Sequence, residues 1–69
     1  MMTKGSVRWR AAERRRLRQI KKDRRADPVE RLAALTTLHV WSRHPQLSVR
    51  DARLCKKLER AIARAARAR

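Results

Sequence analysis

Three side chains in this sequence, those of His39, His44 and Cys55, are suited to bind a transition metal. A structural zinc site normally has four such ligands, usually supplied as closely spaced pairs. These three are unpaired, and Cys55 lies beside an apolar helical stripe, where a small buried thiol packs well. We therefore expect no metal site and no other cofactor.

The remaining reactive residues do not form a catalytic arrangement either. Of the six carboxylates, Asp27 and Asp51 lie where helices are expected to begin, and the other four stand among basic residues. A nucleophilic cysteine needs a neighbouring base, and the only glycine, Gly5, cannot make a Gly-rich phosphate loop. We expect the protein not to be an enzyme and to have no small-molecule substrate.

Basic residues dominate the composition. The 69 residues include 21 Lys and Arg but only 6 Asp and Glu, which gives a formal net charge of +15. Arginine outnumbers lysine by 16 to 5, and the planar guanidinium matches phosphate oxygens better than an ammonium does. A small chain with this charge repels itself and attracts polyanions.

The basic residues fall into two groups along the chain. The run RWRAAERRRLRQIKKDRR, residues 8–25, contains only two acids and places like charges four residues apart, which destabilises a free helix. A second basic stripe follows one side of residues 53–67. Such runs can be solvated helix faces, but two costly positive surfaces favour a polyanionic partner. The residues expected to bind nucleic acid are Arg8, Arg10, Arg14, Arg15, Arg18, Lys22, Arg25, Arg53, Lys57, Arg60, Arg64 and Arg67.

Residues 11–25, AAERRRLRQIKKDRR, resemble the arginine-rich peptides of phage antitermination proteins, which fold as helices in RNA grooves. The resemblance implies that RNA is the partner. The bases along the whole third segment suit backbone tracking, so we expect a structural ribonucleoprotein component or a phage-type regulator. Those peptides stack an aromatic ring on a base, a role open to Trp9, although we slightly favour Trp9 as a hydrophobic anchor. Two alternatives remain: a helix-turn-helix-like DNA reader using Arg50 and Arg53, and a phage-type inhibitor that binds an acidic protein surface.

Proline and glycine divide the chain into three helical segments. The first is expected from Ser6 to Ala26, the second over 28–43 and the third over 49–68. Asp27 is the expected N-cap of the second segment, with Pro28 at its first position, and Ser48 is the expected N-cap of the third. The predicted fold is all-α: an antiparallel helical hairpin (27–69) and an N-terminal basic helix or arm (1–26).

The expected core is thin. In the first segment, Trp9, Leu17 and Ile20 share one side, which we expect to dock weakly. The core is predicted to contain Val29, Leu32, Leu35, Leu38, Val40, Trp41, Leu47, Leu54, Leu58 and Ile62. So few apolar residues predict a homodimer, or a chain that gains order from a larger ribonucleoprotein.

The single cysteine and the hydropathy indicate the compartment. One cysteine forms no disulfide within the chain, which favours a reducing compartment such as the cytoplasm. The Arg-rich, acid-poor start also resembles a mitochondrial transit peptide, so a mitochondrial or other organellar matrix is the alternative location. No apolar run approaches the length that spans a membrane.

Overall fold

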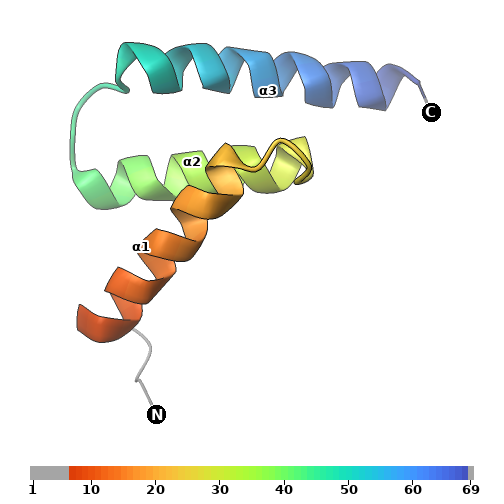
Figure 1. Ribbon diagram of the computed structural model, residues 1–69. Coiled ribbons are helices and arrows are strands. Elements are labelled where there is room, and N and C mark those ends of the chain that lie inside the picture. Colours follow the sequence, from red (N-terminus) through yellow and green to blue (C-terminus); the bar gives the residue numbers. More distant parts are fainter. Residues whose placement is uncertain (1–6, 69) are drawn as a thin grey trace.

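The computed structural model describes residues 7–68, which form three α-helices and no strand. Helix α1 spans Val7–Lys22, α2 spans Pro28–Ser42 and α3 spans Val49–Arg67. Helices α1 and α3 each pack against α2, whereas their backbones do not pack against each other (Figure 1). The all-α class with three helices is confirmed, and α2 is the central helix.

Local side-chain chemistry fixes the ends of α2 and the start of α3. The Asp27 carboxylate accepts a hydrogen bond from the Val29 N–H at 2.9 Å, and Ser48 accepts one from the Asp51 N–H at 3.1 Å. Both predicted N-caps are therefore confirmed. Helix α2 ends at Arg43, which adopts a left-handed conformation with φ 56°.

Helix α1 ends at Lys22, four residues before the predicted end at Ala26. The Asp23 carboxylate accepts a hydrogen bond from the Arg25 N–H at 2.9 Å, which offers the backbone a turn in place of another helical turn. The predicted cap Ser6 lies outside the described residues. The short segment 23–27 then brings the chain to α2.

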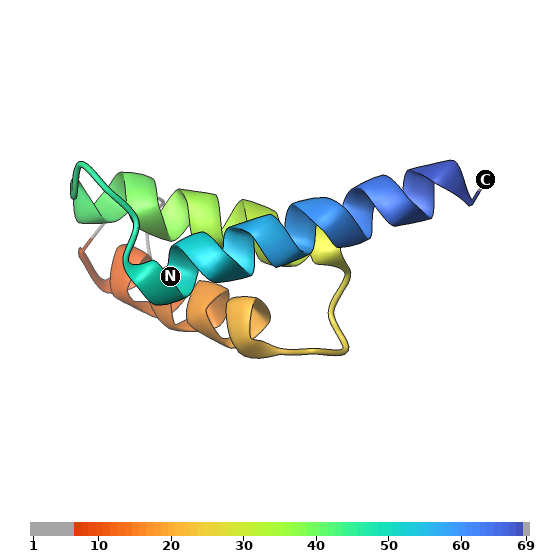
Figure 2. The same cartoon turned by 90° about the horizontal axis from the view of Figure 1, so that it is seen from above.

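The third helix continues past its neighbour. Figures 1 and 2 both show the C-terminal part of α3 extending beyond the N-terminal end of α2. No helix in the described part of the chain is both long and apolar enough to cross a membrane.

The core differs in part from the predicted one. Leu35 and Leu58 are buried as expected, but Val29 and Val40 are 56% and 64% exposed, so their assignment to the core was wrong. Helix α2 is apolar nearly all round, yet only two helices cover it, and these valines lie on the side that neither covers. The six other predicted core residues are half-buried: Leu32, Leu38, Trp41, Leu47, Leu54 and Ile62.

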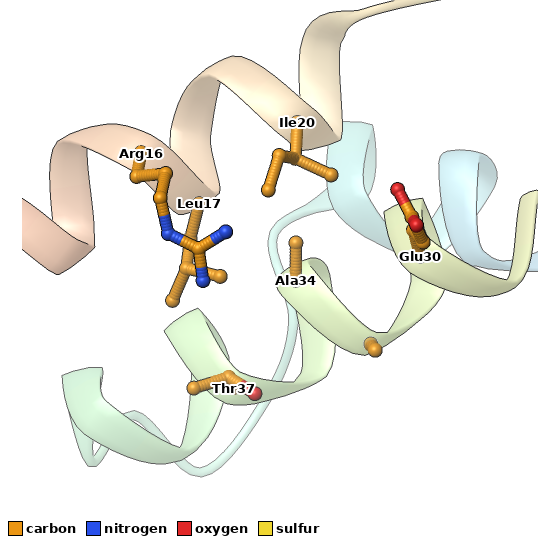
Figure 3. Close-up of a pocket in the computed structure, with 7 residues that line it drawn as sticks. Arg16, Leu17, Ile20, Glu30, Ala34 and Thr37 are labelled. Carbon is orange, nitrogen blue, oxygen red and sulfur yellow. The ribbon is translucent and has the colours of Figure 1, made fainter. Parts of the chain in front are cut away.

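Helix α1 contributes to the core more than its sparse apolar residues suggested. Leu17 is only 8% exposed, and Ala34 of α2 is 2% exposed. Figure 3 shows Leu17 and Ile20 of α1 facing Ala34 across a groove that Arg16 and Glu30 border. Residues 27–69 contain both helices of the predicted hairpin, but loss of Leu17 would expose the Ala34 side of α2.

We expect Leu17→Ala to destabilise the protein strongly. Truncating a buried leucine typically costs about 2–5 kcal/mol, which is a large part of the stability of so small a domain. The matched control is Val49→Ala, because Val49 is 68% exposed and its truncation should change stability by about 0.5 kcal/mol or less. Urea denaturation followed by circular dichroism measures both. Equal midpoints for the two variants would show that α1 is not part of the cooperative core.

Candidate nucleic-acid interface

One face of α1 carries basic side chains that point away from α2. Arg8, Arg15, Arg18 and Lys22 recur at helical spacing, on the side of α1 opposite to buried Leu17. All four are exposed. None forms an ion pair or a side-chain hydrogen bond within the described residues. We call these four residues the α1 basic face.

Two predicted phosphate ligands of α1 lie nearer to the protein body. The Arg10 guanidinium stands 5.2 Å from the ring centroid of Trp41, a cation–π contact with α2. Arg14 is half-buried. Arg10 therefore helps to hold α1 against α2, and neither residue belongs to the α1 basic face.

Trp9 packs against the same Trp41 ring. Its ring is 6.3 Å from that of Trp41, centroid to centroid, in an edge-to-face arrangement. Trp9 is half-buried. This is the geometry of a hydrophobic anchor between α1 and α2. Base stacking by Trp9 stays a prediction, and it would have to coexist with the Trp41 contact or replace it.

Two further bases of α1 are paired with acids. Arg16 binds the Glu13 carboxylate, and this hydrogen bond lowers the pKa of Glu13 and raises the pKa of Arg16. Lys21 donates to Asp51 Oδ1 at 3.2 Å, which links the end of α1 to the first turn of α3. Neither base was predicted to bind phosphate, and both contacts neutralise charge within the protein.

The outer face of α3 is a second basic surface. It contains the predicted residues and also Lys56, which the sequence analysis left out of the site although it lies between Arg53 and Arg60 at helical spacing. All six are exposed and have no ion-pair partner among the described residues. This α3 basic face consists of Arg53, Lys56, Lys57, Arg60, Arg64 and Arg67.

Three arginines of the α3 basic face surround a shallow hollow. Arg60, Arg64 and Arg67 line it together with Ala63, whose small side chain leaves the space open. Cations near a helix C-terminus also offset the helix dipole, which accounts for part of this clustering. The hollow nevertheless brings three planar donors to one place, which suits an anion with several oxygens.

The two basic faces are separate. Each lies on the side of its helix away from α2. Within residues 7–68 the backbones of α1 and α3 are not packed together, and the Lys21–Asp51 pair links the two helices. Arg25, the last predicted ligand, is exposed in the segment between α1 and α2. Apart from Arg10 and Arg14, the structure thus places the predicted residues on two surfaces and a connecting loop, and not in a single cleft.

The thiol and the imidazoles do not come together. Cys55 Sγ donates a hydrogen bond to Glu59 Oε1 at 3.2 Å, and this contact, with some desolvation, raises the pKa of Cys55. His44 is exposed beyond the end of α2. No group of three or more His, Cys, Asp or Glu side chains within residues 7–68 could hold a metal ion.

Comparison of the sequence with protein-family models, with curated proteins and with solved structures gives no match. The function is therefore argued from the charge and geometry of the two basic faces.

We expect the Cys55 thiol to alkylate slowly near neutral pH, because Glu59 favours its protonated form and only the thiolate reacts. Glu59→Gln removes the negative charge and weakens the hydrogen bond, so the pKa should fall and the pH midpoint of iodoacetamide labelling should move down. Glu13→Gln, which removes a remote acid, is the control and should leave the midpoint in place. Identical midpoints for the Glu59 variant and the parent would contradict this account of Cys55.

Proposed function

We propose that the protein binds nucleic acid without catalysis, and that RNA is the preferred partner. One observation supports this most directly: ten exposed bases on the outer faces of α1 and α3 have no acidic partner among the described residues, whereas Arg10, Arg16 and Lys21 are engaged within the protein. Two uncompensated positive surfaces cost free energy in the isolated molecule. A polyanion removes this cost and releases its own counterions.

The three helices have different roles in this proposal. In this proposal α2 and α3 form a hairpin that presents the α3 basic face along its whole length, and α1 is a basic helix that adds a second contact surface. Arg60, Arg64 and Arg67 bind backbone phosphate at the hollow around Ala63. Backbone tracking of this kind suits a component of a structural ribonucleoprotein or a small regulator.

RNA is favoured over DNA because of the arginine-rich sequence of residues 11–25, which resembles groove-binding RNA peptides. A helix-turn-helix reader would concentrate its contacts at the N-terminal end of the recognition helix. Arg50 and Arg53 are exposed there, but the bases of α3 continue to Arg67. Binding of an acidic protein surface is the other alternative. The salt dependence of binding and the preference between RNA and DNA distinguish an RNA binder, a DNA reader and a protein binder.

The α3 basic face is tested by Arg60→Gln with Arg64→Gln. Glutamine keeps helix propensity, and removal of two phosphate contacts should reduce the log–log salt slope of RNA binding by about two units. The matched control is Arg16→Gln with Arg43→Gln, which removes the same charge from positions outside both basic faces. Fluorescence anisotropy with a structured RNA across a salt series gives the slopes.

An equal decrease of the salt slope in the two double variants would show that net charge alone attracts RNA. Parent binding that does not change with salt would contradict the polyanion proposal and favour a packed interface with a protein.

The preference for RNA is tested on α1 by replacing Arg8, Arg15 and Arg18 with Lys. This variant keeps the charge but loses the bidentate guanidinium forks. If the α1 basic face reads an RNA groove, affinity for structured RNA should fall about tenfold or more, and affinity for duplex DNA should change little. Anisotropy titrations at one salt concentration measure both. A variant that binds RNA and DNA as the parent does would contradict an RNA-specific role for α1.

A further inference from the structure

A stripe of α2 remains uncovered by both neighbouring helices. Val29, Ala33, Thr36 and Val40 lie on one side of the helix at spacings of four, three and four residues, and all four are exposed. The Thr36 hydroxyl donates to the Leu32 carbonyl at 2.8 Å, so its donor is already satisfied within the helix. The four residues, which we call the α2 stripe, therefore present a surface that is apolar in effect.

Two shallow grooves border the α2 stripe and widen it. On the α1 side, Ala33 and Thr37 line a groove with Leu17 and Ile20, as Figure 3 shows in part. On the α3 side, Val29 lines a second groove that is completed by Pro28, Ile62, Ala65 and Ala66. Apolar side chains thus extend across α2 from α1 to α3. Arg16 and Glu30 also line the groove on the α1 side, and Asp27 also lines the groove on the α3 side.

Acidic and basic residues lie at opposite ends of the α2 stripe. The stripe itself carries no base, and its N-terminal end lies beside two acids, Asp27 and Glu30. Its C-terminal end lies beside Arg43, which is exposed just after the helix. One end is therefore acidic and the other basic, so the surface is complementary to itself when it is turned end to end.

We propose that the α2 stripe is the contact surface for a second copy of this chain, packed antiparallel across a two-fold axis. In that arrangement Val29 of one copy lies opposite Val40 of the other, and Ala33 lies opposite Thr36, which allows close approach of the helices. The acidic end of each stripe then lies beside Arg43 of the other copy. A two-fold contact is self-complementary in this way.

The size of the molecule fits this inference. Its accessible surface is 6213 Å², so a standard interface of about 800 Å² per partner would cover about an eighth of it. Only four hydrophobic side chains are buried among the described residues. A second copy would bury more apolar area at the α2 stripe and both grooves. This burial would add hydrophobic stabilisation to a protein whose own core is small.

The salt dependence of self-association should be opposite to that of nucleic-acid binding. Two chains that each carry a charge of +15 repel each other. Raising ionic strength from about 0.1 M to about 1 M shortens the Debye length from about 10 to about 3 Å and screens this repulsion, while apolar contacts persist. The dimer should therefore strengthen with salt. This inference does not depend on the proposed function, because it is tested on nuclease-treated protein alone.

Sedimentation equilibrium of the full chain, from about 10 µM to about 1 mM, measures the association at both salt concentrations. We expect a monomer–dimer equilibrium that tightens at high salt. A monomer at every concentration and salt level would overturn the proposal, as would association beyond a dimer, since a two-fold contact is closed.

The surface is tested by Ala33→Arg, with Ala63→Arg as the matched control. Both positions are exposed on helices, so the two variants gain the same charge on a residue that favours helix. Ala33→Arg places like charges against each other at the centre of the contact and should weaken the dimer about tenfold or more. Circular dichroism checks the fold. Equal weakening in both variants would locate the interface elsewhere.

The orientation is tested by Arg43→Glu, with Arg15→Glu as its control. Both substitutions lower the net charge equally, and reduced repulsion alone would strengthen the dimer in both. In the antiparallel arrangement, however, the carboxylate that Arg43→Glu introduces would face Asp27 and Glu30 of the second copy. Arg43→Glu should therefore weaken the dimer while Arg15→Glu strengthens it. Strengthening by both variants would overturn the antiparallel arrangement.

Discussion

Helix α2 supplies two adjacent residues, Ala34 and Leu35, to a core that has only four buried hydrophobic side chains among the described residues. Because neighbours in a helix differ by about 100° in direction, the two side chains face different sides. Leu17 of α1 lies on the Ala34 side, and α3 contributes Leu58. The packing of both outer helices therefore depends on one central helix, and neither outer helix has a second packed surface that could replace it.

This central position of α2 also determines where charge can be placed. The body of α2 carries few charged residues, whereas α1 and α3 have basic faces on the sides that point away from it. Three bases closer to α2 are engaged: Arg16 by Glu13, Lys21 by Asp51 and Arg10 by the Trp41 ring. The exposed bases without partners are thus a consequence of the fold's geometry as well as of composition, and they leave two separate positive surfaces on one small molecule.

The features that follow from local chemistry could be predicted from the sequence. The caps at Asp27 and Ser48, the starts of α2 and α3 and the basic side of α3 each depend on residues within one or two turns. The sequence placed Leu17 on the docking side of the first segment but did not predict its near-complete burial. The exposure of Val29 and Val40 could not be predicted, because a helix that is apolar nearly all round does not reveal which sides its neighbours cover. The engagement of Arg10 required the position of Trp41, about thirty residues away in sequence. The Glu13–Arg16 pair was not predicted either, although residues three apart on a helix are neighbours.

The order of the helices has a consequence for how quickly the chain reaches its native state. Each packed pair of helices is consecutive in the sequence, and only short segments, 23–27 and 43–48, join them. Loop closure of this length costs little entropy, and low contact order is associated with folding in microseconds to milliseconds. The Lys21–Asp51 pair is the one ion pair of the described residues that bridges non-consecutive helices. A chain of this topology is therefore expected to refold on this timescale each time it unfolds.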